Sequence, residues 1–173
     1  ETSSYEEDKE LWRKLYKMFI FDNEELDTLL EEQSLYWNDD KSIVDTFVVK
    51  TIKRFEEENG ASQQLLPEYK DVADMEFARK LFRAAITNAE EYRALMSGSS
   101  KNWDMQRLAF MDVVIMQTAL AEILTFEDIP LSVTLNEYVE IAKYYSTAKS
   151  GSFVNGLLDS ITKKLRQEGK INK

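Results

Sequence analysis

The stretch "AKSGSF" places residues that can bind an anion beside one that can stack on a base. Lys149 supplies a cation, and Ser150 and Ser152 lie at the start of a helix predicted over residues 150–167. The free backbone amides and the positive dipole end of a helix start attract phosphate. Phe153 follows directly, and stacking of a base on an aromatic ring contributes roughly 1–3 kcal/mol. We therefore interpret Lys149, Ser150, Ser152 and Phe153 as a candidate site for single-stranded nucleic acid.

The position of Phe153 on its predicted helix leaves two interpretations open. At about 100° per residue, one stripe of apolar side chains must face the core: Val154, Leu157, Leu158, Ile161 and Leu165. Phe153 lies about 100° from the centre of this stripe, so its ring is expected to be at least partly available at the surface. The alternative is that the serines only cap the helix and that Phe153 packs against a neighbouring helix.

Helical periodicity recurs along the chain and predicts an all-α fold. Only 5 Gly and 2 Pro occur. Seven helices are predicted, at about residues 6–20, 24–36, 41–58, 74–96 and 102–124, from just after Pro130, and at 150–167. The fifth is almost uncharged in its second half, which predicts the central buried helix. Thr134 and Glu137 are interpreted as a capping box at the start of the sixth.

The segment "GASQQLLPEYKD" is the best candidate for a linker. It separates an N-terminal helical segment, residues 1–70, from a C-terminal helical region, residues 71–173. We expect the two to pack together as one compact domain. In the N-terminal segment, Trp12, Tyr16 and Phe19 share one helical face, which predicts core or a surface that docks a partner helix.

The composition argues against most kinds of catalytic site. His and Cys are absent, which removes the common zinc and iron ligand sets, thiol catalysis and an imidazole base. The helical di-iron pattern needs histidines beside its glutamates, so the many Glu pairs are interpreted as solvated helix faces. No glycine-rich phosphate loop occurs, and the serines of "SGS" have no basic partner. We therefore predict no enzyme activity, no metal and no cofactor, and a carboxylate metal enzyme is the weakest alternative.

The charge of the chain is negative overall but unevenly distributed. The net charge is −10, which argues against a general nucleic-acid binder. Residues 1–40 hold 13 acidic and 4 basic residues, whereas residues 141–173 hold 7 basic and 2 acidic residues. One local anion-binding face near the basic end is therefore possible. No stretch approaches the roughly 18 apolar residues of a membrane span, so we expect a cytoplasmic protein without membrane contact. The chain begins with Glu1, and we expect either a fragment of a longer protein or a processed terminus.

The pattern "IPLSVTLNEYVEIAKYYS", followed by "SGSFVNGLLDSI", resembles the C-terminal signature of the NusB family of bacterial transcription antitermination factors. Upstream, "NWDMQRLAFMDVVIMQTALAEIL" resembles the central helix of that family, and "FARKLFRAAITNAEEY" resembles the helix before it. The resemblance extends over about residues 74–161. It implies a NusB-like all-α fold of two packed small helical bundles.

The resemblance also implies a function and its residues. It implies binding of boxA-type single-stranded RNA together with a small-subunit ribosomal protein, NusE. That pair joins an antitermination complex on RNA polymerase, notably at ribosomal RNA operons. Phe153 matches the RNA-contacting aromatic residue of the family, with Lys149, Ser150 and Ser152 beside it.

Two residues are implied to face the ribosomal protein. Asp112 matches an acidic position on that surface, and Gln106 is a further candidate for it. The alternative for Asp112, judged from the residues, is a hydrogen bond within the core.

The first helix departs from the family pattern. It reads "SYEEDKELWRKLYKMFIF" and holds only Arg13, Lys14 and Lys17 among many acids, where the family has an arginine-rich helix. Each lost phosphate contact removes a counterion-release contribution to affinity. We expect either that the basic helix precedes this sequence or that RNA binding is weak. The alternative function is a NusB-like protein–protein interaction module with little RNA binding.

Overall fold

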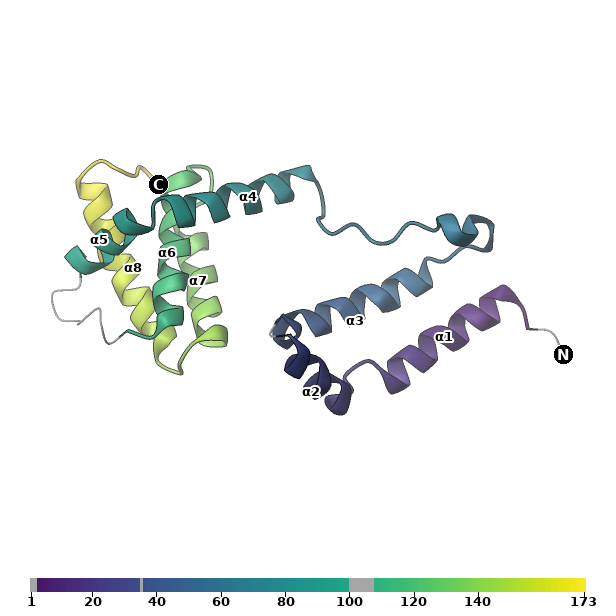
Figure 1. The fold of residues 1–173 in the computed structure, drawn as a ribbon. Helices are drawn as coiled ribbons and strands as arrows, with labels where there is room; N and C mark the ends of the chain where they lie inside the picture. Colours follow the sequence, from purple (N-terminus) through teal and green to yellow (C-terminus); the bar gives the residue numbers. More distant parts are fainter. Residues whose placement is uncertain (1–2, 35, 100–107) are drawn as a thin grey trace. The chain divides into compact units, whose positions relative to one another are not determined.

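The computed structural model describes residues 3–34, 36–99 and 108–173. The regular elements within these ranges are all helices, so the all-α prediction is confirmed. The chain divides into two compact units, Glu1–Lys70 and Asp71–Lys173, and Figure 1 labels the α-helices of each.

Three α-helices and a short 3-10 helix form the N-terminal unit: α1 Tyr5–Phe19, α2 Glu24–Gln33, α3 Trp37–Lys53 and η1 Glu57–Ser62. A capping box begins α1, because Ser4 Oγ accepts from Glu7 N at 3.3 Å and Ser4 N donates to the Glu7 carboxylate at 2.8 Å. Asn23 caps α2 by accepting from Leu26 N at 3.0 Å. Both α1 and α2 pack against α3.

Charged side chains occupy the interior of the N-terminal unit. Among its described residues, only Lys41 and Asp45 are buried, at 8% and 3% exposure. Lys41 Nζ lies 2.6 Å from Asp45 Oδ2, 2.8 Å from Asp27 Oδ1 and 3.2 Å from the carbonyl of Ile20. The hydroxyl of Tyr16 donates to Asp45 Oδ1 at 2.7 Å. This network joins all three α-helices, and removal of one partner would leave a desolvated charge uncompensated.

The aromatic face of α1 is therefore only partly internal. Trp12 and Phe19 are 66% and 60% exposed, so the prediction that they form core is wrong. Tyr16 is half-buried because its hydroxyl reaches the ionic network. The polar groups at the centre of the unit leave little room for these two large side chains.

Five helices form the C-terminal unit: α4 Val72–Thr87, α5 Ala89–Ser99, α6 Phe110–Thr125, α7 Leu131–Tyr145 and α8 Ser150–Gln167. The central position of α6 is confirmed, because it contacts each of the other four. Met116, Ala119 and Leu120 on α6 are completely buried, and full burial of a Met or Leu side chain contributes about 1.5–3 kcal/mol. In Figure 1, α6, α7 and α8 run side by side and α4 crosses α6.

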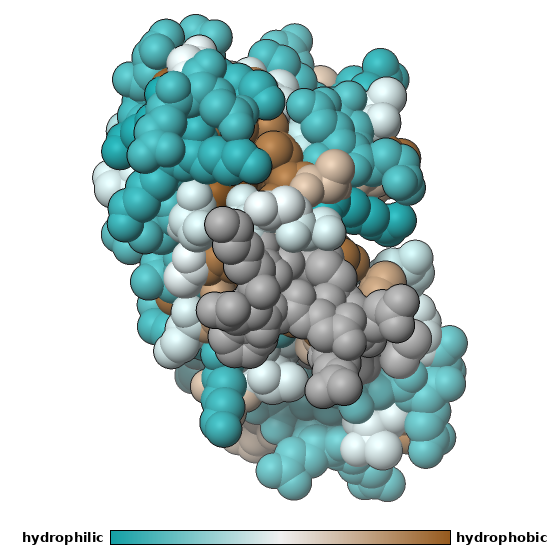
Figure 2. All heavy atoms as spheres, turned by 90° about the vertical axis from the view of Figure 1, so that its left-hand side faces the viewer, coloured by the Kyte–Doolittle hydropathy of each residue, from teal (hydrophilic) through white to brown (hydrophobic). Residues whose placement is uncertain are grey.

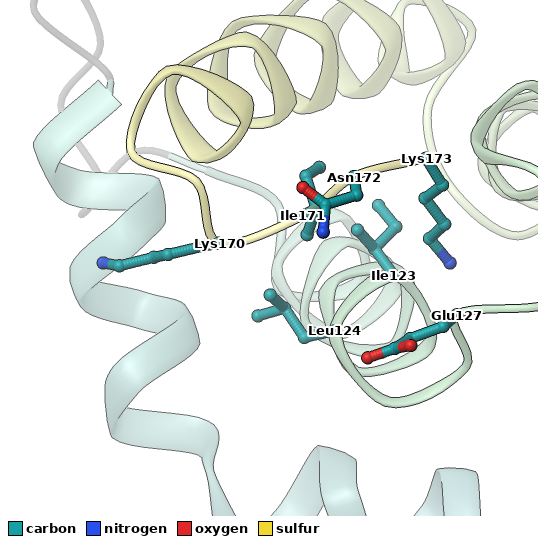
Figure 3. A pocket seen from close by; sticks show the side chains of 7 residues that line it. All are labelled: Ile123, Leu124, Glu127, Lys170, Ile171, Asn172 and Lys173. Atoms are coloured by element: carbon teal, nitrogen blue, oxygen red, sulfur yellow. The ribbon is translucent and has the colours of Figure 1, made fainter.

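The chain reverses direction after α8 and returns to the core. Gly169 has a φ of +68°, and the N–H groups of Gly169 and Lys170 donate to the carbonyls of Arg166 and Leu165 at 3.1 and 2.9 Å. This is the Schellman pattern that glycine favours at a helix end, so the predicted end of this helix is confirmed. Ile171 is buried, and Figure 3 shows it beside α6 at the edge of a small hollow, with Lys170 pointing away.

The predicted helix over 74–96 is two helices, and this prediction is wrong at Asn88. Asn88 leaves the helical region at φ −106° and ψ 20°, and its Nδ2 donates to the hydroxyl of Tyr92 at 3.1 Å. One residue earlier, Thr87 Oγ1 donates to the carbonyl of Arg83 at 2.5 Å. Local side-chain bonds of this kind compete with helix continuation.

The sixth helix begins earlier than its predicted capping box. Pro130 precedes α7 at φ −60°, and its carbonyl accepts from the N–H groups of Val133 and Thr134 at 2.9 and 3.3 Å. Thr134 is fully buried inside the helix, so its prediction as the cap, together with Glu137, is wrong. Proline at this point fixes φ and needs no hydrogen-bond acceptor of its own.

Boundaries of three other helices also differ from the predictions. The helix predicted over 24–36 ends at Gln33, and the helix predicted over 41–58 spans Trp37–Lys53. Leu108 and Ala109 are not helical, and α6 begins at Phe110. The first part of the helix predicted over 102–124 lies outside the described residues.

Hydrophilic side chains predominate on the face shown in Figure 2, where hydrophobic ones are confined to small areas. Within the described ranges, no helix has both the length and the apolar character needed to cross a bilayer.

Candidate nucleic-acid interface

The turn between α7 and α8 is fixed by the side chain of Ser150. This residue is 1% exposed, and its Oγ donates to Ser146 Oγ at 3.1 Å and accepts from Thr147 N at 3.1 Å. The hydroxyl of Thr147 lies 2.8 Å from the same oxygen, and the backbone N–H of Ser150 donates to the carbonyl of Thr147 at 2.9 Å. Ser150 thus holds the turn in place, and its hydroxyl points inward.

A side chain at Gly151, next to this turn, would require Lys143 to shift. A Cβ built at Gly151 would lie 2.8 Å from Lys143 Cγ, closer than real side chains approach one another. Lys143 lies in the last turn of α7, and its Nζ forms an ion pair with Glu140 at 2.5 Å. The lysine stem therefore packs directly over the first turn of α8.

The start of α8 presents groups that suit an anion. Lys149 and Ser152 are exposed. No side chain caps the start of α8, and no acidic residue lies in its first turn. The N–H of Phe153 donates to the carbonyl of Lys149 at 3.2 Å, whereas within the described residues the N–H groups of Gly151 and Ser152 have no acceptor. Two open amides, a cation and a hydroxyl at a helix N-terminus can together hold a phosphate.

Phe153 lies on the flank of its helix, as the sequence predicts. The five stripe residues, from Val154 to Leu165, are all buried. Phe153 is half-buried and packs against their cluster. One part of the Phe153 ring therefore packs against the core, and the other part remains accessible beside the anion-binding groups.

Two tyrosines that the sequence reasoning missed lie at the end of α7. Tyr144 is 82% exposed and Tyr145 is 43% exposed, and their ring centroids are 5.3 Å apart. Tyr144 follows Lys143 in the chain and lies opposite the buried positions Tyr138 and Ala142. A helical wheel of α7 would have shown a large aromatic residue on its polar face, one turn before the anion-binding residues.

The two residues predicted to face a protein partner are differently placed. Asp112 lies in the first turn of α6, is 6% exposed, and its Oδ1 has no hydrogen-bond donor within the described residues. Gln106 lies outside the described residues. The other buried acid of α6, Glu122, accepts from the hydroxyl of Tyr138 at 3.1 Å. Burial and the charge of Glu122 raise the pKa of Tyr138, so the Tyr138 hydroxyl remains the donor in this bond.

The described ranges contain no group of three or more carboxylates placed to hold a metal ion.

Comparisons with known proteins identify the family. The NusB family model matches residues 46–163, a range that includes Asp112 and the whole turn before Phe153. The transcription antitermination protein NusB of Salinibacter ruber is 36% identical over 132 residues, which cover 73% of this chain and 82% of that protein. The NusB protein of Chloroherpeton thalassium is 34% identical over 122 residues, and the chain spans 58% of its length.

A solved structure agrees with these matches. The structure of T. maritima NusB is 37% identical in sequence to this chain. The match covers 64% of this chain and 78% of the chain in that structure, with a TM-score of 0.52. The fold and the matched residues define an all-helical transcription factor of a non-enzymatic class. The chain belongs to the NusB family.

Proposed function

We propose that this chain is an RNA-binding transcription antitermination factor that recognises boxA-type single-stranded RNA. It does so with a small-subunit ribosomal protein, NusE, as part of an antitermination complex on RNA polymerase at ribosomal RNA operons. The site of action is then the cytoplasm, where bacterial transcription takes place. The family assignment and the names of the relatives, which are transcription antitermination proteins, support this role.

The observation that carries the proposal is the uncapped, acid-free start of α8 beside two aromatic side chains. Lys149 and the open amides of Gly151 and Ser152 suit a phosphodiester. Phe153 and Tyr144 provide rings for bases. Stacking requires an unpaired base, so this combination favours a single strand over a duplex.

The family resemblance makes Asp112 a candidate contact of the ribosomal protein. Its Oδ1 is buried without a donor in the described part of the chain, and buried carboxylate oxygens normally have one. Gln106 remains a candidate for the same surface from the family resemblance.

Fluorescence anisotropy of a labelled boxA-type RNA, with and without the ribosomal protein, tests the function. We expect binding that is tighter with the ribosomal protein present, and weaker for a scrambled RNA. Phe153→Leu keeps apolar packing but removes the ring, and should weaken binding by about 1–3 kcal/mol. Binding of the ribosomal protein with no RNA affinity in either setting would refute the RNA role and leave a protein–protein interaction module.

A further inference from the structure

The end of α3, the helix η1 and the residues just after η1 line an open hollow of about 840 Å³ within the N-terminal unit. Its lining includes three cations from five consecutive positions, Lys50, Lys53 and Arg54. The unit as a whole is acidic, with 18 acidic and 9 basic residues in positions 1–70. The hollow is therefore a local exception to the charge around it.

The three cations have no carboxylate partner among the described residues. By contrast, Lys9, Arg13 and Lys41 in the same unit all form ion pairs of 2.6 to 2.8 Å. Lys50 Nζ lies only over the ring of Phe47, 5.8 Å from its centroid. Cations in the last turn of a helix interact favourably with the negative end of the helix dipole. That interaction does not explain why polar side chains line the hollow opposite these cations.

Side-chain amides supply that lining, and one of them fixes its shape. Gln63 Oε1 accepts from the N–H of Glu56 at 3.1 Å and from Asn59 Nδ2 at 3.0 Å, and Gln63 Nε2 donates to the carbonyl of Gln64 at 3.2 Å. Gly60 has a φ of +45° and a ψ of −128°, with open space around it, so η1 is kinked at this residue. The amides of Asn59 and Gln64 line the hollow, and each keeps N–H groups to donate.

We infer that this hollow binds a phosphate group. Lysine ammonium groups, arginine guanidinium groups and amide N–H donors are the groups that bind phosphoryl oxygens in proteins. Glu56 is the single acid in the lining, so an excess of two positive charges remains. The phosphate comes from an RNA backbone or from a free phosphoanion, and the site is independent of the one at α8.

Titration of the full chain with pyrophosphate, followed by NMR, tests the site without any RNA. We expect saturable shifts of the Arg54 amide and of the Asn59 and Gln64 side-chain amides. The double variant Lys53→Gln/Arg54→Gln should raise the dissociation constant about tenfold or more. The matched control, Lys14→Gln/Lys17→Gln, removes the same charge from α1 of the same unit and should leave the constant unchanged. Shifts confined to residues 149–153, or equal losses in both variants, would overturn the inference.

Single-stranded RNA then identifies the source of the phosphate. If RNA is the ligand, it competes with pyrophosphate for these signals, and the Lys53/Arg54 variant shows a shallower salt dependence of RNA binding than the control variant. If the ligand is a free phosphoanion, RNA leaves the signals unchanged while pyrophosphate still binds. Failure of RNA to bind anywhere would count against the proposed function but not against this site.

Discussion

The stem of Lys143 on α7 lies against the backbone of Gly151 on α8, with 2.8 Å between Lys143 Cγ and the place of a Cβ at position 151. This contact packs the last turn of α7 against the first turn of α8. The exposed groups on both turns, Tyr144 and Lys149, are consequently held in a fixed relation. The geometry of the proposed RNA site thus depends on the absence of a side chain at position 151.

Gly151→Ala should destabilise the fold by about 1 kcal/mol, because the added methyl overpacks the junction by more than the helix propensity of alanine offsets. Lys143→Ala removes the opposing stem, so the double variant should recover most of that loss. Thermal denaturation of the four proteins gives the coupling free energy. Equal losses with and without Lys143 would show that the strain has another source.

Tyr144→Ala should weaken RNA binding by about 1–3 kcal/mol without lowering the melting temperature, because the ring is almost fully exposed. Tyr36→Ala is the matched control, since Tyr36 is 83% exposed and lies in the other unit. Anisotropy with boxA-type RNA is the measurement. If the two variants bind RNA equally well, Tyr144 has no stacking role.

Lys41→Met should destabilise the N-terminal unit by about 3–5 kcal/mol, because it leaves Asp27 and Asp45 without their cation. Hydrogen exchange should quicken in α1, α2 and α3 and remain slow in α6. Lys14→Met changes an exposed lysine and should alter neither. Unchanged protection of α3 in the Lys41 variant would show that the ionic network does not stabilise the unit.

Burial, together with the hydrogen bond to Asp45, raises the pKa of Tyr16 from 10.0 to about 12. An unfolded tyrosine loses its proton near pH 10, whereas the folded one keeps it to about pH 12. Stability from this group is therefore complete below pH 10 and declines as the pH rises to 12. Ultraviolet titration should show a late phenolate step that disappears in Tyr16→Phe and moves to lower pH in Asp45→Asn. A step at the same pH in Asp45→Asn would exclude Asp45 as a cause.

Asp112→Asn should weaken the complex with the ribosomal protein by about 1.5–3 kcal/mol, the worth of a hydrogen bond to a charged group. Stability should change little, because the amide has the same shape as the carboxylate. Glu122→Gln is the control, since Glu122 bonds to Tyr138 within the chain. Isothermal titration with the ribosomal protein and a melting curve separate the roles. A lower melting temperature with unchanged affinity would place Asp112 in the core.

Where a strong apolar stripe and clear end signals coincide, the sequence predicted the element well. The helix over 150–167 was predicted with its observed bounds, because five buried side chains repeat on one face and Gly169 ends it. The break at Asn88 was not predictable in the same way, because the apolar pattern continues across it.

Tertiary electrostatics explain the larger error. The spacing of Trp12 and Phe19 indicated core, but the interior of that unit is occupied by Lys41 and its partners. Asp27 and Asp45 come from different helices, so no local pattern shows that they meet. The same limit applies to the candidate site. Residue types indicated an anion-binding helix start, but only the fold shows that Ser150 faces inward.

The buried amine of Lys41 also allows the opening of this unit to be followed by chemical labelling. Amine-acetylating reagents need a deprotonated, accessible nitrogen, and this one is enclosed by two carboxylates. Burial lowers the pKa of the Lys41 amine, but its hydrogen bonds to Asp27 and Asp45 outweigh that effect and raise the pKa. Its labelling rate would then follow the opening of the three-helix unit, and peptide mass spectrometry could record that opening in cell extracts without purification.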